Sequence, residues 1–229
     1  MRKALLTILI VGAAGALLAS NMGFKLSYNL VNAGTVGNNW VSLPYYYTPA
    51  DLNSNSLVDA EDLCDDIGGP CAAASSCTIG RWNTATDAPV TWTCQGTRGT
   101  PFTLTAGESV FVKVNAGTTF VVVGSHNPSL GYALANAGTV GNNWFSVPYH
   151  ANLPDNNANS LMDAEDLCDD IGGPCAAASS CTIGRWNTAT DAPVTWTCQG
   201  TRGTPFTLTT GEGVFIKVNA NTTYTPSHY

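Results

Sequence analysis

The chain has 229 residues, of which 44% are hydrophobic and only 11% are charged, and its formal net charge is −7. An acidic chain with few Lys and Arg residues has no electrostatic footprint for a phosphate backbone, so nucleic-acid binding is not expected. Thr, Asn, Ser and Gly take the place of charged residues, and this composition favours strands and turns over surface helices.

The N-terminus has the pattern of a secretory signal peptide. Met1-Arg2-Lys3 is basic, Ala4–Ala19 is apolar and uncharged, and small residues close the run. The alternative is a membrane anchor, but the run is short for a span of about 20 residues. We predict a signal peptide over residues 1–20 and a secreted protein that is extracellular, at the cell surface or periplasmic. No membrane association is expected after cleavage.

Within the first copy of the repeat described below, short strands alternate with turns. Apolar and polar residues alternate over Phe24–Leu30, which predicts a strand, and Trp40–Pro44 predicts a second strand that the proline ends. Asp59 is expected to cap a short helix that ends at Gly68-Gly69-Pro70.

The rest of the copy is expected to be strands. Thr78–Asn83 and Val90–Gln95 predict a hairpin, Phe102–Thr105 and Val110–Val114 predict a second pair around a glycine turn, and Thr119–Val123 predicts a last strand. The predicted fold class is mostly β: a tandem pair of small β-sandwich or open-barrel domains, each with one short helix.

The tandem arrangement follows from an internal repeat. Asp59–Thr105 recurs without change as Asp163–Thr209, so the two copies must fold alike. We predict one β-rich repeat domain at 21–124, a connector at 125–130 and a second domain at 131–229. Because the connector is too short to act as a free linker, the domains are expected to be adjacent and partly docked.

Eight cysteines in an exported chain indicate disulfides. They form two sets with the same internal spacing: Cys64, Cys71, Cys77 and Cys94, and then Cys168, Cys175, Cys181 and Cys198. Neither set contains a Cys-x-x-Cys or a histidine, so a zinc site is not indicated. Each set allows three pairings, one of which staples the expected helix to the end of the hairpin while another bridges across the hairpin.

Oxygen-bearing side chains recur at alternate positions just before the expected helix. Counted from Asp51, side-chain oxygens fall at positions 1, 3, 5, 9 and 12, and position 7 offers its backbone carbonyl. This is the spacing of a twelve-residue calcium loop. The candidate ligands are Asp51, Asn53, Asn55, Leu57, Asp59 and Asp62 in the first copy, and Asp155, Asn157, Asn159, Leu161, Asp163 and Asp166 in the second.

One position of the loop departs from the pattern. Position 6 is Ser56 or Ser160, where the loop needs glycine, and a non-glycine residue at positive φ costs roughly 1–2 kcal/mol. Weak binding is therefore expected, at the Kd of about 10⁻⁴–10⁻³ M of extracellular modules. The alternative is a polar surface loop that runs into a helix cap. The candidate ligands persist although Leu52 of the first loop is Asn156 in the second, and this favours calcium.

Two resemblances add to these predictions. The segments Asn-Trp-Val-Ser-Leu-Pro, Gly-Arg-Trp-Asn, Thr-Trp-Thr-Cys and Gly-Glu-x-Val-Phe resemble those of uncharacterised secreted bacterial β-rich repeat domains. The loops resemble the dockerin type of calcium loop, in which Asp stands at position 12 and a leucine (Leu63 or Leu167) follows. In the resembling repeat domains a helix cysteine and a strand-end cysteine often occur alone. This implies the pairs Cys64–Cys94, Cys71–Cys77, Cys168–Cys198 and Cys175–Cys181.

These patterns predict a structural or adhesive protein whose partners are other surface or matrix components or further copies of itself. A carbohydrate-binding module is the alternative, with tryptophans as stacking platforms: Trp40, Trp82 and Trp92, repeated as Trp144, Trp186 and Trp196. No catalytic motif is present and no histidine recurs in both copies, so an enzyme is not expected. A carboxylate-based hydrolase that uses Asp87 and Glu108 is the second alternative.

Overall fold

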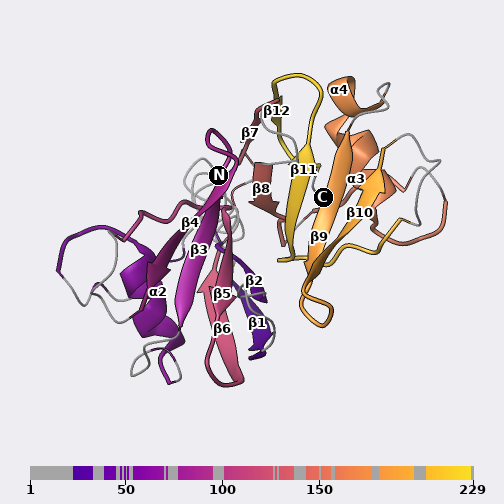
Figure 1. Ribbon diagram of the computed structural model, residues 1–229. Helices are drawn as coiled ribbons and strands as arrows, with labels where there is room; N and C mark the ends of the chain where they lie inside the picture. Colours follow the sequence, from indigo (N-terminus) through magenta and orange to yellow (C-terminus); the bar gives the residue numbers. More distant parts are fainter. Residues whose placement is uncertain are drawn as a thin grey trace, which may run out of the picture.

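The structure is a computed structural model that forms two similar halves lying side by side (Figure 1). It describes residues 23–32, 39–44, 47, 49, 51, 54–69, 71, 77–94, 101–125, 127, 129–136, 143–149, 151–155, 158–176, 181–198 and 205–227. The predicted signal peptide lies outside these residues. Half 1 runs from β1 to β6 and half 2 from β7 to β12.

Half 1 contains a four-stranded antiparallel sheet in the order β2-β5-β3-β4 and a two-stranded ribbon, β1-β6. Its elements are β1 (Phe24–Leu30), β2 (Asn39–Ser42), α2 (Ala60–Ile67), β3 (Thr78–Asn83), β4 (Ala88–Thr93), β5 (Ser109–Lys113) and β6 (Thr118–Gly124).

Half 2 repeats this plan, with the sheet β8-β11-β9-β10 and the ribbon β7-β12. Its elements are β7 (Tyr132–Leu134), β8 (Asn143–Ser146), α3 (Ala164–Ile171), α4 (Gly173–Ala176), β9 (Thr182–Asn187), β10 (Ala192–Thr197), β11 (Gly213–Lys217) and β12 (Thr222–Tyr224). The predicted mostly β tandem pair is therefore confirmed, and α4 is an additional short helix.

The β3–β4 hairpin forms as the sequence predicts, but its second strand is Ala88–Thr93 and not the expected Val90–Gln95. Asn83 Oδ1 accepts hydrogen bonds from the backbone N–H groups of Ala85 and Thr86 and so organises the turn. The second strand starts at Ala88, not at Val90, and contains Pro89. A proline is tolerated there because β4 is the edge strand of the sheet, where one row of backbone groups needs no partner.

The prediction that Phe102–Thr105 pairs with Val110–Val114 is wrong. The N–H of Leu104 donates to the carbonyl of Val58 at 2.8 Å, and the carbonyl of Phe102 accepts from the N–H of Ala60 at 3.0 Å. The segment thus closes over the start of α2 and contributes only an isolated bridge, Thr103 to Asp59. β5 pairs instead with β2 and β3.

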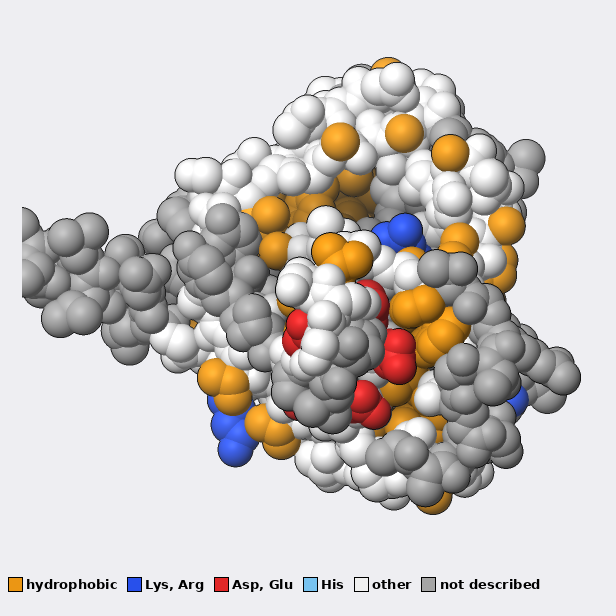
Figure 2. All heavy atoms as spheres, turned by 90° about the vertical axis from the view of Figure 1, so that its left-hand side faces the viewer, with side chains coloured by type: hydrophobic (Ala, Val, Ile, Leu, Met, Phe, Trp, Pro, Cys, Tyr) orange, Lys and Arg blue, Asp and Glu red, His pale blue; other side chains and the backbone are white. Residues whose placement is uncertain are grey.

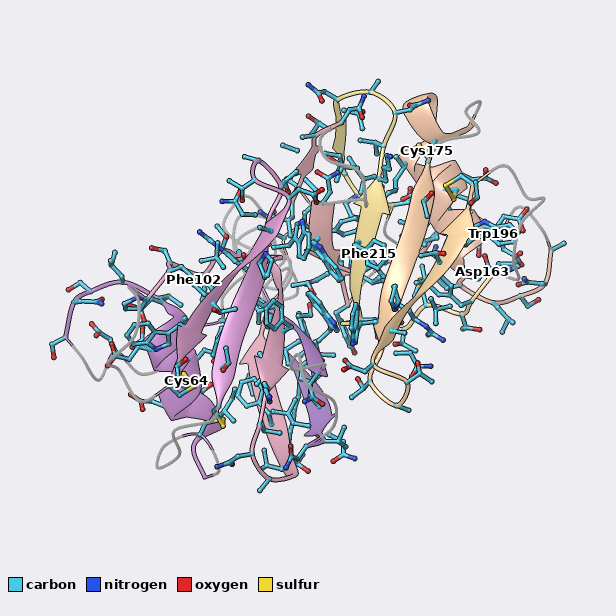
Figure 3. The ribbon with its side chains drawn as sticks, viewed as in Figure 1. Cys64, Phe102, Asp163, Cys175, Trp196 and Phe215 are labelled. Atoms are coloured by element: carbon cyan, nitrogen blue, oxygen red, sulfur yellow. A yellow bond between two sulfur atoms is a disulfide. The ribbon has the colours of Figure 1, made fainter. Side chains whose placement is uncertain are left out.

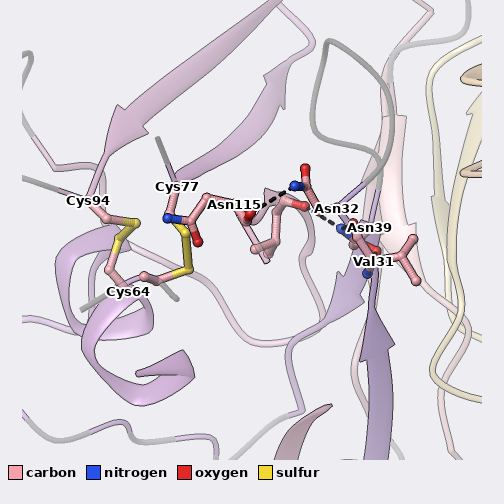
Figure 4. Close-up of a disulfide and its surroundings, with 9 residues drawn as sticks. Val31, Asn32, Asn39, Cys64, Cys77, Cys94 and Asn115 are labelled. Atoms are coloured by element: carbon pink, nitrogen blue, oxygen red, sulfur yellow. Dashed lines mark hydrogen bonds between the residues drawn. A yellow bond between two sulfur atoms is a disulfide. The ribbon is translucent and has the colours of Figure 1, made fainter. Parts of the chain in front are cut away.

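Each half has one core, between one face of its four-stranded sheet, its helix and its ribbon. In half 1 the sheet contributes Val41, Ile79, Val110 and Val112, all of them 0% exposed. A buried asparagine joins the ribbon to the sheet. Asn39 Nδ2 donates to the carbonyl of Val31 at 2.9 Å (Figure 4) and to the carbonyl of Val112 at 2.9 Å. Asn143 makes the equivalent bonds in half 2.

The other face of each four-stranded sheet meets the other half. β2 and β5 pack against β8 and β11, and Figure 3 shows Phe215 of β11 on the side of half 2 that faces half 1. The indole rings of Trp40 and Trp144 stack with centroids 3.8 Å apart. The N–H of Ser146 also donates across the boundary to the carbonyl of Gly107 at 3.1 Å.

Candidate functional site

The described part of each predicted calcium loop curls around the carboxylate at its first position. Asp51 accepts hydrogen bonds from the backbone N–H groups of Asn55 (3.1 Å) and Ser56 (2.9 Å). Asp155 accepts the same pair of bonds from Asn159 (3.0 Å) and Ser160 (2.8 Å). The two loops therefore share these contacts although they differ at position 4, where Ser54 corresponds to Ala158.

The serine at position 6 does adopt the left-handed backbone that the sequence pattern predicts. Ser56 has φ 63° and Ser160 has φ 61°. Position 4 is strained as well, which the sequence pattern did not predict: Ser54 has φ 59° and Ala158 has φ 56°. Each such residue costs on the order of 1–2 kcal/mol, and strain of this kind clusters at ligand-binding sites.

The end of the loop is also the start of the helix. Asp59 Oδ1 accepts from the N–H groups of Glu61 (2.8 Å) and Asp62 (3.3 Å), and Asp62 Oδ2 accepts from the N–H of Asp59 (3.0 Å). This reciprocal capping box confirms Asp59 as the helix cap. Asp163 and Asp166 form the same box in half 2, and Figure 3 marks Asp163 there.

Both capping carboxylates are buried, which the sequence pattern did not predict. Asp59 is 2% exposed and Asp62 is 1% exposed. Burial, followed by the negative charges of Asp59, Asp51 and Glu61, raises the pKa of the Asp62 carboxyl above its ordinary value. Asp62 Oδ1 has no hydrogen-bond partner among the described residues. A buried carboxylate oxygen without a donor is costly unless a cation compensates it.

Among the described residues, the arginine side chains near the loop form ion pairs with glutamates and not with the loop carboxylates. Arg81 lies 3.7 Å from Glu108 in an ion pair and stacks over Phe102, and Arg185 forms the equivalent pair with Glu212 at 3.2 Å. Figure 2 shows acidic side chains gathered in one cluster on the face of half 1 that it views, with the few Lys and Arg side chains outside that cluster.

The other predicted ligands are only partly in place. Asn55 Nδ2 donates to Asp59 Oδ2 at 2.9 Å, and Asn55 Oδ1 accepts from the N–H of Leu57 at 2.7 Å. Leu57 and Leu161 are about half exposed, and Asn53 and Asn157 lie outside the described residues. No three His, Cys, Asp or Glu side chains in the described ranges stand close enough together to hold a metal ion as they are. Ion binding would require the carboxylates to draw together and the Asn55 amide to turn.

The disulfide pairing implied by the resemblance is confirmed in both halves. Cys64 of α2 is bonded to Cys94 at the end of β4, with Cα atoms 5.6 Å apart, and Cys71 to Cys77, with Cα atoms 5.2 Å apart (Figure 4). The bridges Cys168–Cys198 and Cys175–Cys181 repeat this in half 2. The first bridge of each half joins the helix to the sheet just after the loop.

Most of the tryptophans proposed as sugar platforms are taken up by packing, and Trp186 is half-buried. Trp92 and Trp196 are each 3% exposed in the cores. Trp40 and Trp144 cover each other between the halves, and Trp82 lies 6.3 Å from Trp144, centroid to centroid.

The carboxylates of the proposed hydrolase have structural contacts. Glu108 Oε2 accepts from the N–H of Thr105 at 3.0 Å and from its hydroxyl at 2.9 Å. Asp87 ends the β3–β4 turn with φ 53°. The three histidines, His126, His150 and His228, lie outside the described residues.

No protein-family model matches the chain, and no curated protein or solved structure matches it at a significant level. The likeness to β-rich repeat domains and to dockerin loops therefore stays a prediction. In the described part of the chain, no helix is long and apolar enough to cross a membrane.

Proposed function

We propose that the protein is an exported structural or adhesive component of the cell surface or extracellular matrix, stiffened by one calcium ion in each half. The observation that carries this proposal is Asp62. Among the described residues its buried Oδ1 has no donor, and the neighbouring charges that raise the pKa of the carboxyl are all negative. A divalent cation would remove both costs at once.

Calcium fits the donor set of the loop. It is a hard cation that takes six to eight oxygen ligands in a flexible geometry. Asp51, Asp59 and Asp62 would supply carboxylates, Asn53 and Asn55 would supply amide oxygens, and Leu57 would supply its carbonyl. The equivalent set in half 2 is Asp155, Asn157, Asn159, Leu161, Asp163 and Asp166.

The position of the loop supports a mechanical role for the ion. The loop leads directly into α2, which Cys64 joins to the sheet through Cys94. Phe102 and Leu104 hydrogen-bond to the residues that link the loop and the helix. An ion held by the loop would therefore fix the corner at which loop, helix and sheet meet, and the strain at Ser54 and Ser56 would be offset by binding.

The proposed compartment agrees with these features. Four disulfides suit an oxidising environment outside the cytoplasm. A site with a Kd of about 10⁻⁴–10⁻³ M is useful where calcium is abundant. The partners would be other surface or matrix components, or further copies of the same protein.

Calorimetric titration of the full chain with calcium chloride tests the ion. Two sites are expected, one of which is lost in Asp62→Asn and both of which are lost in Asp62→Asn/Asp166→Asn. Asp65→Asn/Asp169→Asn is the matched control, because these acids lie on the same helices but are exposed. Absence of binding at millimolar calcium, or unchanged binding in Asp62→Asn/Asp166→Asn, would contradict the proposal.

Export has its own test. The N-terminus of the protein recovered from outside the cytoplasm is expected at Ser20 or Asn21. A chain recovered there that still begins at Met1 would contradict cleavage of the predicted signal peptide.

A further inference from the structure

The two halves meet through equivalent surfaces. Trp40 of β2 and Trp144 of β8 occupy matching positions in the two copies, and their rings stack with an interplanar angle of 4°. Phe111 and Phe215, also equivalent, lie beside them, with ring centroids 5.4 Å from Trp40 and 4.6 Å from Trp144 respectively. The centre of the boundary is thus the same row of aromatic residues used twice.

The packing contacts around these rings are reciprocal. A Cβ added to Gly107 of half 1 would lie 2.7 Å from Leu130 of half 2, and one added to Gly211 of half 2 would lie 2.6 Å from Leu26 of half 1. Leu26 and Leu130 are equivalent, as are Gly107 and Gly211. Reciprocity of this kind defines a two-fold, isologous interface, here formed within one chain.

A two-fold interface brings some positions against their own equivalents, and Ser109 and Gly213 are such a pair. Both are buried where β5 and β11 face each other, and Ser109 is 0% exposed. A Cβ added to Gly213 would fall on Ser109 Oγ and would lie 3.2 Å from the Cβ atoms of Ser109 and Trp40. Ser109 Oγ has no hydrogen-bond partner among the described residues, so its visible role is to fill this space.

We infer that Ser109 and Gly213 form a steric key. Because of this pair, the face of half 1 packs against the face of half 2, and not against the same face of another half 1, and the same holds for half 2. One serine and one glycine fill the space. Two serines would place their Cβ atoms about 3.2 Å apart, tighter than ordinary contact, and rotating a hydroxyl away does not relieve that approach, so the facing strands must shift. Two glycines leave a void, whose lining atoms lose their contacts. The face of half 1 around Trp40 therefore selects the matching face of half 2.

Glycine at 213 is not required by the strand itself. Its backbone is not in the left-handed region, unlike that of Gly211. Gly213 of β11 pairs with Ser146 of β8, as Ser109 of β5 pairs with Ser42 of β2. The same strand position therefore accepts serine in half 1, and the glycine is explained by what it faces across the boundary.

Three full-length variants test the key. Gly213→Ser places two serines at the boundary and is expected to separate the halves. Ser109→Gly/Gly213→Ser restores one serine and one glycine and is expected to re-dock them. Ile216→Val is the matched control, because Ile216 lies on the same strand but faces its own core, and Val112 is its equivalent in half 1.

Docking has two independent readouts. Stacked Trp40 and Trp144 should give an exciton couplet in the circular dichroism spectrum, and small-angle scattering reports the radius of gyration. The inference predicts loss of the couplet and a larger radius in Gly213→Ser, both reversed in the exchanged double variant, with wild-type values in Ile216→Val. An unchanged couplet and radius in Gly213→Ser would overturn it. A double variant that fails to recover would also overturn it, since glycine would then be needed within half 2 itself.

Discussion

The two halves share an identical block of sequence, yet they hold the end of its helix with different residues. In half 1, Asp66 accepts a hydrogen bond from the hydroxyl of Tyr47 at 2.6 Å. In half 2 the position of Tyr47 is occupied by Ala151. The equivalent acid, Asp170, accepts instead from the hydroxyl of Tyr224 at 2.7 Å.

The replacement donor comes from a different element of the fold. Tyr224 belongs to β12, and its equivalent in half 1 is Phe120, a core residue. Ser227, just past β12, adds its backbone N–H and its hydroxyl to Asp170. The ribbon of half 2 is accordingly short, with Thr222–Tyr224 where β6 of half 1 has seven residues.

The comparison shows that the acid at the helix end, which belongs to the shared block, receives its hydrogen bond from a residue outside the block in each half. An acid in the last turn of a helix faces the negative end of the helix dipole, and neither last turn contains a basic residue. A hydroxyl donor offsets this repulsion in both halves. The repeated block thus contains the acid that needs a hydrogen-bond donor, and the donor lies outside the block in both halves.

Removal of the helix-to-sheet disulfide is expected to destabilise the two halves equally. Cys64→Ser/Cys94→Ser and Cys168→Ser/Cys198→Ser are each expected to lower the free energy of unfolding by about 2–5 kcal/mol, because each removes the bridge between helix and sheet. Urea unfolding of the two variants measures the loss. Since the block is identical, losses that differ greatly between the variants would contradict the equivalence of the halves.

Removal of the tyrosine hydroxyl at the helix end is expected to destabilise the two halves by different amounts. Tyr224→Phe removes a hydrogen bond to a half-buried carboxylate and is expected to cost about 1.5–3 kcal/mol. Tyr47→Phe acts on the exposed Asp66 and is expected to cost only about 0.5–1 kcal/mol. Urea unfolding again supplies the comparison.

A transplant sharpens this prediction. Ala151→Tyr places the donor of half 1 at the equivalent position of half 2, and it should recover part of the stability lost in Tyr224→Phe. If Tyr47→Phe costs as much as Tyr224→Phe, the account of the two donors is wrong.

The strained loop positions are expected to respond alike in the two halves, with a smaller effect. Ser56→Gly and Ser160→Gly relieve a positive φ, although glycine also makes the unfolded chain more flexible. A net gain of about 0.5–1 kcal/mol is expected for each. Loss of stability in either variant, measured by thermal unfolding in chelator, would show that the serine side chain matters more than the strain.

The smallest expected effect is on the part of the pH dependence of stability that the Asp62 carboxyl contributes. Burial and its acidic neighbours raise the pKa of Asp62, so protonation stabilises the folded chain. This contribution is complete below the pKa of an unfolded Asp, about 3.9, and is lost as pH rises through the folded pKa. In chelator, the difference in Tm between Asp62→Asn and the wild type should therefore shift in favour of Asp62→Asn as pH rises from about 4 towards neutrality. Parallel Tm profiles would argue against a raised pKa.

The local features of the fold follow from sequence. The helix cap at Asp59, the helix end at Gly68 and the strand Thr78–Asn83 depend on neighbouring residues, and all three form as predicted. The partner of Phe102–Thr105 could not be inferred in this way, because strand pairing depends on which distant segments approach. Its alternating apolar residues are compatible with pairing to β5 or to the start of α2.

In the candidate site, too, the local features follow from the sequence and the long-range ones do not. The spacing of oxygens predicts the loop, and the positive φ of Ser56 follows from that template. The burial of Asp62 does not, since it depends on the segment that closes over the helix. The boundary between the halves left one signal in the sequence: Val110-Phe111-Val112 is apolar without alternation, as in a strand buried on both faces.

The central claim, a calcium ion in each half, is tested most directly by thermal unfolding of the full chain in calcium and in chelator. At about a hundred times Kd, each ion would add about 2.7 kcal/mol, so the Tm should rise by several degrees in calcium. Asp62→Asn/Asp166→Asn should unfold at the same temperature in both conditions. A wild-type Tm that is the same in chelator and in calcium at about a hundred times Kd, about 10–100 mM, would contradict the account.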